Sequence, residues 1–304
     1  FIKFTKYRRT YIAEVYGGVS IGPQIQHLRR ADVVVGTPGR LLDHLSRGTL
    51  NTNSIRILIL DEADKMFEMG FIDDVKVIIS RIPKDSQKLL FGATMPQAIM
   101  NIANKYMNNP EKVKMQTYVD KSKLIQNYYQ VDKHRKFSLL AHILKKESKG
   151  LTIIFCATRH MVDIIDKNLN RQNIKAQALH GGMTQSRRNQ VMELFRDGKL
   201  DVLVASDVAA RGLDIKNVNL IINYNLPKTS EEYVHRIGRT ARAGNEGKVI
   251  SLLSPEDHDN FRKVLEDRSL LVHKIETPYF QDIEFSRPQY NRRHFYNKFS
   301  RNRR

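Results

Sequence analysis

An apolar run that ends abruptly in acidic residues, Ile57–Asp64, constrains the fold of this chain more than any other stretch. Its apolar part is short and ends at Leu60, which is typical of a strand buried on both faces of a parallel sheet. Asp61 and Glu62 then fall at the carboxyl end of that strand, where ligands of open α/β sheets bind. One carboxylate there can hold a hydrated Mg²⁺ in a nucleotide site, while the other takes a proton from an attacking water. A plain strand followed by a helix with acids in its first turn fits the same residues, because acids are favoured at the positive end of the helix dipole.

Short apolar runs alternate with helix-like segments along the whole chain, which predicts an α/β protein with parallel sheets and helices on their faces. Strands are predicted over 12–16, 32–36, 56–60, 87–91, 125–131, 151–156, 174–178, 201–205, 218–224 and 247–253. Helices are predicted over 24–30, 65–81 with an interruption at Gly70, 95–106, 135–146, 159–169, 185–195 and 256–266.

The alternation is interrupted at 108–117, where Asn109-Pro110 favours the end of a helix. We therefore expect a first α/β domain over 1–115, a second over 116–272 and a disordered basic, aromatic tail over 273–304. Two such domains in tandem imply a cleft between them.

The net charge of +19 and the pI near 9.9 favour a polyanionic partner, most simply nucleic acid. A ribosome-associated protein or a protein of a membrane surface can show the same balance. The sequence has no apolar run of membrane-spanning length and no signal-peptide pattern. The single cysteine, Cys156, excludes an intrachain disulfide, so a reducing, cytoplasmic setting is expected.

From Phe285 onward the chain carries seven basic side chains, no acidic one and five aromatic residues. Basic residues interleaved with stacking rings suit single-stranded RNA. A solvated tail with non-specific attraction for RNA explains the composition better than a defined site does.

In the first predicted domain, Gly17-Gly18 follows a strand, where a glycine pair makes a turn or lets a sugar-phosphate backbone approach closely. Thr37 and Pro38 favour a helix start, and the adjacent Arg40 makes this start suitable for a phosphate. An ordinary turn and an ordinary capped helix with a surface arginine are the alternatives.

The second predicted domain contains a similar combination after its strand at 174–178. Gly181-Gly182 and a helix start at Thr184 fit a phosphate backbone, as does a glycine turn with a helix cap. His180 has no cysteine or carboxylate partner at metal-ligand spacing, so we interpret it as structural.

Two further stretches of the second domain suit contacts with a nucleotide. In His235–Arg242 three arginines stand at three-residue intervals around Gly238, and arginine suits bidentate phosphate contacts; an RNA-phosphate patch is the alternative. Ser206–Asp214 follows a strand, so Asp214 can hold ribose hydroxyls while Gly212 allows a close backbone approach. A structural loop is the alternative there.

Taken together and in this order, these stretches closely resemble the DEAD-box family of ATP-dependent RNA helicases, from about Tyr11 to about Leu265. The stretches that carry the resemblance are Gly17-Gly18, Thr37–Arg40, Asp61–Asp64, Gln185 with Arg188, Ser206–Asp214 and His235–Arg242.

The resemblance implies two RecA-like domains that close on ATP and single-stranded RNA and locally unwind short duplexes. It implies that Asp61 binds Mg²⁺ through water and that Glu62 positions and deprotonates the attacking water. The remaining implied roles are coupling to domain closure by Asp64, Thr94 and His235; arginine fingers at Arg239 and Arg242; nucleotide binding by Gly212 and Asp214; and RNA-backbone contacts by Gly18, Thr37, Arg40, Gly181, Gln185, Arg188 and Ser206. Ribosomal or RNA-processing proteins are expected as further partners, and a membrane is not.

Three departures from the family pattern stand out. No Gly-x-x-x-x-Gly-Lys-Ser/Thr phosphate loop occurs in the 304 residues, so we expect a fragment that hydrolyses little or no ATP by itself. Gly92 stands where the family has a serine, which is expected to weaken the link between hydrolysis and unwinding. Asn225 stands where the family usually has an aspartate, with little expected effect. A non-catalytic RNA-binding scaffold on a helicase fold and a related DNA-directed helicase are the competing hypotheses.

Overall fold

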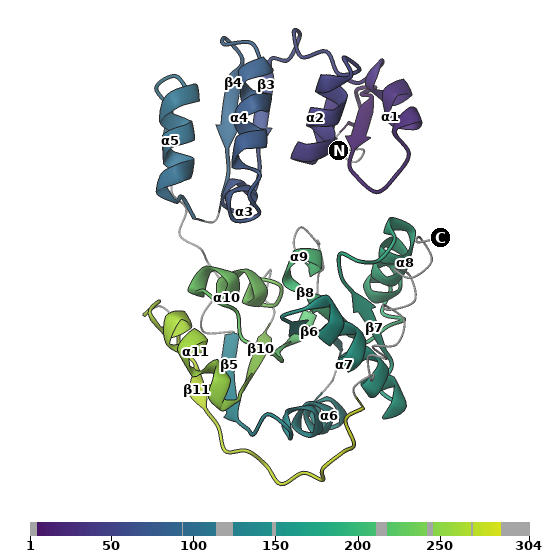
Figure 1. The fold of residues 1–304 in the computed structure, drawn as a ribbon, viewed down its shortest axis with the longest axis vertical. Helices are drawn as coiled ribbons and strands as arrows, with labels where there is room; N and C mark the ends of the chain where they lie inside the picture. Colours follow the sequence, from purple (N-terminus) through teal and green to yellow (C-terminus); the bar gives the residue numbers. More distant parts are fainter. Residues whose placement is uncertain are drawn as a thin grey trace, which may run out of the picture. The chain divides into compact units, whose positions relative to one another are not determined.

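The computed structural model describes residues 5–92, 94–113, 124–147, 150–210, 218–241, 246–268 and 270–286 (Figure 1). The chain divides into two compact units, Phe1–Met115 and Gln116–Arg304, which we describe separately. No helix within the described ranges is long and apolar enough to cross a membrane.

The first unit consists of two parallel strand pairs and the helices that follow them. Strand β1 pairs with β2, with Val15 opposite Gly36, and β3 pairs with β4, with Leu60 opposite Leu90. In chain order the elements are β1 Ile12–Val15, α1 Ile21–Leu28, β2 Val33–Gly36, α2 Pro38–Ser46, β3 Ile57–Leu60, α3 Ala63–Glu68, α4 Ile72–Arg81, β4 Gln87–Leu90 and α5 Gln97–Tyr106. The predicted interruption at Gly70 separates α3 from α4, and Gly70 has a φ of 80°.

The acidic strand β3 is buried on one face only, so the prediction of burial on both faces is wrong for it. Leu58 and Leu60 pack against a small core that includes Val75 of α4. Ile57 and Ile59, which alternate with them, are 55% and 53% exposed. The described residues of this unit therefore cover one side of the β3–β4 pair and leave the other side open to solvent. Strand β2 is also exposed on one face, because Val35 is 47% exposed.

The second unit is a seven-stranded parallel sheet in the order β11-β5-β10-β9-β6-β8-β7. Its elements are β5 Leu124–Gln130, α6 Lys136–Glu147, β6 Leu151–Cys156, α7 Arg159–Arg171, β7 Ala176–Leu179, α8 Gln185–Arg196, β8 Val202–Ser206, α9 Asp207–Ala210, β9 Val218–Asn223, α10 Ser230–Ile237, β10 Gly247–Leu253, α11 His258–Leu265 and β11 His273–Lys274.

Helices cover both faces of this sheet, which confirms the predicted α/β architecture. Alternate residues of β6 point to opposite cores: Ile154 joins the side chains of α6 and α7, and Ile153 joins those of α8, α10 and α11. Both residues are fully buried, so the central strands are continuously apolar. The predicted helix at 256–266 begins with a short 3-10 turn, Pro255–Asp257, before α11. Elements α9, α10 and β11 are absent from the sequence-based prediction.

The segment after α11 is ordered against the second unit as far as Ser286, so the expectation of a disordered tail from residue 273 is wrong for this part. β11 adds to the sheet beside β5. The segment that follows β11, drawn in yellow in Figure 1, then runs past α6. Phe280 is 4% exposed, and the backbone of Ser286 both donates to and accepts from the side chain of Asn168 on α7. The rest of the predicted tail, from Arg287, lies outside the described residues.

Candidate functional site

The acidic pair directly follows β3, where the sequence predicts it. Glu62 has a left-handed conformation, φ 50° and ψ 46°, and its backbone N–H donates to Asp61 Oδ1 at 2.9 Å. A left-handed backbone is uncommon outside glycine, so this loop is a strained element of the kind that collects at functional sites. Both carboxylates are exposed. A pair of exposed acids fits Mg²⁺, which keeps several waters and takes one or two carboxylates together with substrate phosphates.

Asp64 is buried, with 1% exposure, and its carboxylate fixes the acidic loop to the end of the neighbouring strand. Oδ1 accepts from the backbone of Lys65 at 3.0 Å. Oδ2 accepts from the backbone N–H of Thr94 at 2.9 Å and from its hydroxyl at 3.1 Å. The structure thus brings together two of the three residues expected to couple the site. The third, His235, belongs to the other unit.

The glycine that departs from the family pattern, Gly92, lies against this contact. A Cβ at Gly92 would stand 2.9 Å from the carbonyl oxygen of Thr94 and 3.3 Å from Asp64 Oδ1. A serine there would therefore require the backbone that approaches Asp64 to shift. Glycine at this position allows Thr94 to close tightly on the carboxylate.

Three of the residues expected to contact RNA come together at the carboxyl ends of β1 and β2. The backbone N–H of Thr37 donates to Val15 O at 2.9 Å, which places the start of α2 beside the Gly17-Gly18 loop. Gly18 has a φ of 83° and is exposed. Both terminal nitrogens of Arg40 lie 3.2 Å from Val19 O, so its guanidinium holds the loop.

In the second unit, His180 fixes the other glycine pair. Its Nδ1 accepts from the backbone N–H of Gly182 at 3.1 Å, and its Nε2 lies 2.9 Å from Asp163 Oδ1. This contact supports the interpretation of His180 as structural. No group of three or more metal-binding side chains occurs within the described ranges.

Helix α8 begins directly beyond this loop and carries two more of the residues expected to contact RNA, Gln185 and Arg188. The hydroxyl of Thr184 caps α8 by accepting from the backbone N–H of Arg187 at 3.3 Å. Arg188 donates to Gln185 Oε1 at 3.3 Å, so these two predicted residues form a pair. Ser206 ends β8 and is buried, with 7% exposure.

Arg236 holds several strand ends of the second unit together. The sequence assigns it no role of its own among the three arginines of His235–Arg242. Its side chain is 2% exposed and forms a bidentate pair with Asp207, at 2.6 and 2.8 Å. It also donates to Asn223 Oδ1 at 2.8 Å and to the carbonyl of Asn225 at 2.7 Å, and it lies over the ring of Phe155. Arg236 therefore joins the ends of β6, β8 and β9 to α10.

Arg239 follows α10 and is half-buried beside a small hollow that Asp207, Glu232 and His235 also line. The other residues expected to bind the nucleotide, Gly212, Asp214 and Arg242, lie outside the described residues.

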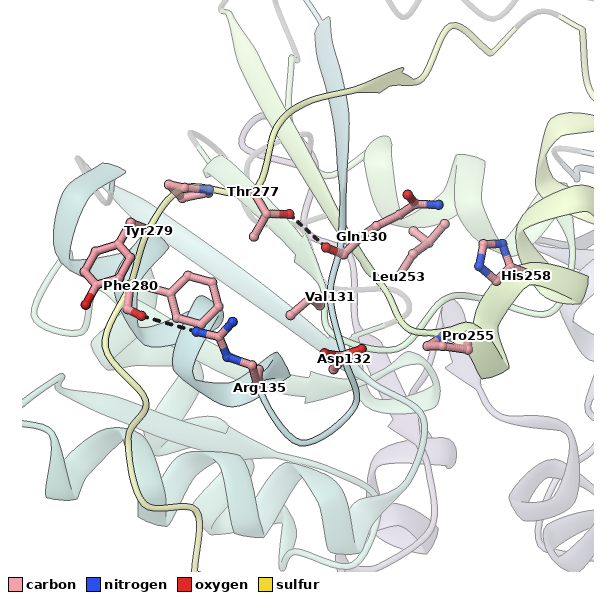
Figure 2. Close-up of a pocket in the computed structure, with 11 residues that line it drawn as sticks. Gln130, Val131, Asp132, Arg135, Leu253, Pro255, His258, Thr277, Tyr279 and Phe280 are labelled. Atoms are coloured by element: carbon pink, nitrogen blue, oxygen red, sulfur yellow. Dashed lines mark hydrogen bonds between the residues drawn. The ribbon is translucent and has the colours of Figure 1, made fainter.

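A larger pocket, of about 610 Å³, lies between the ends of β5 and β10 and the segment after β11 (Figure 2). Arg135 donates to the carbonyl of Phe280 there, and Thr277 donates to that of Gln130. The residues that line it, which include Tyr279 and Leu253, contain none of the predicted site residues.

The pKa of His44, a fully buried residue of α2, is lowered from its ordinary value by burial and by the charge of Arg40. The imidazole of His44 therefore binds a proton more readily in the unfolded chain than in the folded chain. The free energy of unfolding is expected to fall as the pH drops below about 6.5. The melting temperature at about pH 5.5 and about pH 7.5 checks this prediction. The melting temperature of His44→Gln should differ less between these two pH values than that of the wild type. An equal difference in both proteins would contradict the prediction.

The two parallel-sheet units, with acidic and arginine-rich residues at the ends of their strands, define an α/β protein of the tandem RecA-like class. The profile described as "DEAD/DEAH box helicase" matches residues 1–102, and the profile described as "Helicase conserved C-terminal domain" matches residues 135–244. The crystal structure of a DEAD box protein from the hyperthermophile Methanococcus jannaschii is 41% identical, with a TM-score of 0.50, over 88% of this chain and 73% of that one. The chain belongs to the DEAD-box helicase family.

Other relatives agree with this assignment. The ATP-dependent RNA helicase CshA of Listeria monocytogenes is 41% identical over 269 residues, which cover 88% of this chain and 52% of the relative. S. cerevisiae Dbp5 bound to RNA and ADP BeF3 has a TM-score of 0.80 at 28% identity, over 91% of this chain and 73% of that one. The chain spans about half the length of the curated relatives it matches.

Proposed function

We propose that these 304 residues supply the water-activating, coupling and RNA-binding parts of an ATP-dependent RNA helicase that binds single-stranded RNA and locally unwinds short duplexes. The observation that carries the proposal is the exposed Asp61-Glu62 pair, tied to Thr94 through the buried Asp64. A change at the acids is thereby transmitted to the end of the adjacent strand.

The residues of the first unit have distinct roles in this proposal. When bound, Mg²⁺ neutralises charge on the phosphates of ATP. Asp61 holds the ion through water, and Glu62 orients the attacking water and accepts its proton. Asp64 and Thr94 keep the loop of these two acids fixed and, with His235, couple it to domain closure.

The second unit contributes positive charge toward the nucleotide. Arg239 and Arg242 act as arginine fingers on the terminal phosphate, and Gly212 and Asp214 hold the nucleotide itself. The immobilised Arg236 supports this assignment, because it anchors the helix that precedes Arg239. A cytoplasmic setting, and ribosomal or RNA-processing partners, belong to the same proposal.

In this proposal, residues of both units contact the sugar-phosphate backbone of the RNA. Solved relatives supply support: Dbp5 is described as bound to RNA and ADP BeF3, and Mss116p, at 25% identity and a TM-score of 0.73, as bound to ssRNA and AMP-PNP. The residues proposed here are Gly18, Thr37 and Arg40 in the first unit and Gly181, Gln185, Arg188 and Ser206 in the second.

Two adjacent arginines of α8 test this proposal. Arg188→Ala should weaken binding of single-stranded RNA and reduce the salt slope of log K by about 0.7, because one phosphate contact with a single strand is lost. Arg187→Ala is the matched control. Arg187 donates to Gln190 on the same helix and to Gln177 on strand β7. Titration of a labelled RNA at several salt concentrations measures both. Equal effects of the two substitutions would contradict the assignment of Arg188.

The basic residues beyond Ser286 give a second test. Removing residues 287–304 deletes seven basic side chains and no acidic one. If the tail attracts RNA non-specifically, the salt slope should fall by up to about 5, because each neutralised phosphate of a single strand contributes about 0.7. A slope that stays as steep after the deletion would show that the main electrostatic contact lies elsewhere.

A further inference from the structure

A buried polar network lies between α1 and α2, next to the Gly17-Gly18 loop. Gln24 of α1 is 4% exposed and His44 of α2 is fully buried. Burying an amide and an imidazole is unfavourable unless their polar atoms find partners. The partners of these two side chains show what the network holds.

Gln24 connects the loop to α2. Its Nε2 donates to the carbonyl of Tyr16 at 3.0 Å, directly before the glycine pair. This bond fixes the orientation of the amide, so Oε1 faces Arg40 Nη1 at 3.3 Å and His44 Nε2 at 3.1 Å. Arg40 in turn donates to the carbonyl of Val19, directly after the glycine pair.

The network also fixes the protonation of His44. Gln24 Oε1 can only accept, so His44 Nε2 carries the hydrogen and Nδ1 accepts. The hydroxyl of Thr49, just beyond the end of α2, lies 2.8 Å from Nδ1 and 3.1 Å from the carbonyl oxygen of His44, and its one hydrogen is directed at these two acceptors. A chain of polar contacts thus runs from Thr49 through His44 and Gln24 to Tyr16.

The glycine pair has no packing of its own that could hold it. A Cβ added at Gly17 or at Gly18 would meet no atom within 4 Å. The arrangement of this exposed turn therefore depends on the carbonyls of Tyr16 and Val19, which Gln24 and Arg40 hold from either side.

We propose that Gln24 and His44 are positioning residues that hold the Gly17-Gly18 loop in the arrangement that binds a phosphate of single-stranded RNA. The proposal rests on the proposed function, because it takes this loop as an RNA contact. Arg40 belongs to the same network, so it holds the loop in addition to its proposed contact with RNA. Ordering the loop in advance removes the entropic cost of ordering it on binding.

The test compares Gln24→Met, which keeps the side-chain volume, with Thr52→Val as a matched control. Thr52 is also buried in the first unit, and its hydroxyl donates to the carbonyl of Arg81, away from the glycine loop. Both variants lose one buried polar side chain, so both should lower the melting temperature. Binding of a fluorescein-labelled single-stranded oligouridylate is measured with the full chain at about 0.3 M salt, where non-specific attraction is weak.

Gln24→Met should weaken binding about tenfold, as expected if the competent loop arrangement falls to about one tenth of the population. It should also accelerate hydrogen exchange at residues 16–19, whereas Thr52→Val should change neither quantity. Thr49→Val removes the hydroxyl that contacts His44 at the far end of the network, on a partly exposed residue, and should act in the same direction, more weakly. It serves as the test if Gln24→Met does not fold.

If the wild-type chain binds the oligouridylate and Gln24→Met and Thr49→Val bind it equally well, the positioning role is overturned while the proposed function stands. Equal losses in Thr52→Val would overturn it as well, because the effect would then follow stability. Failure of the wild-type chain to bind the oligouridylate would contradict the proposed function itself.

Discussion

Replacing Arg236 with alanine should lower the free energy of unfolding of the second unit by about 3–5 kcal/mol, because a largely buried ion pair loses one of its partners. Asp207 would lose both bonds of its bidentate pair, and its side chain is only 22% exposed to water that could replace them. Asn223 Oδ1 and the carbonyl of Asn225 would lose a donor at the same time. For a unit of this size the melting temperature should fall by roughly 10 °C, measurable by calorimetry.

The surface pair of Arg262 and Asp259 on α11 supplies the control. Both side chains are largely exposed, 78% and 81%, so Arg262→Ala should cost less than about 1 kcal/mol. Arg236→Lys should fall between the two, because lysine keeps the charge but cannot reproduce the bidentate fork. If Arg236→Ala melts within about 2 °C of wild type, Arg236 does not hold the strand ends together.

Replacing Asp64 with alanine should lower the free energy of unfolding of the first unit by about 2–4 kcal/mol, since several donors lose their acceptor at once. The backbone N–H groups of Lys65 and Thr94 and the hydroxyl of Thr94 all point at this carboxylate. Denaturant unfolding monitored on the first unit measures the loss.

Asp85→Ala, at an exposed turn of the same unit, should change stability by less than about 0.5 kcal/mol. Thr94→Val should cost about 1 kcal/mol, because it removes the hydroxyl contact but keeps the backbone one. An Asp64→Ala variant as stable as Asp85→Ala would mean that the acidic loop is not fixed to Thr94.

Much of the second unit is predictable because its strands are apolar and clearly bounded. The prediction at 151–156 coincides with β6, and that at 247–253 coincides with β10; both begin at or next to a glycine and pack on both faces. Helix α10 is missing from the prediction although Thr229 accepts from the backbone of Glu232, a helix-start pattern that the sequence contains. β11 is only two residues long and depends on its pairing with β5, which no local pattern encodes.

The sequence places site residues at strand ends but says little about which side chains meet. Asp61 and Glu62 follow from the end of an apolar run. The contact of Asp64 with Thr94 joins residues 30 positions apart, and only the parallel pairing of β3 with β4 creates it. Gln24 and His44 give no signal at all, because a polar residue on a short helix is usually exposed. The exposed face of β3 was mispredicted since an apolar run does not report how many of its faces are covered.

The central claim is tested most directly by ATP hydrolysis after these 304 residues are joined, at Phe1, to a strand, Gly-x-x-x-x-Gly-Lys-Thr loop and helix from a DEAD-box relative. The account predicts hydrolysis that rises when single-stranded RNA is added and that Glu62→Gln lowers by about 10²–10⁴. The 304 residues alone should show little or no turnover. A folded chimera that binds ATP and RNA, but whose hydrolysis is absent or unaffected by Glu62→Gln, would contradict the account.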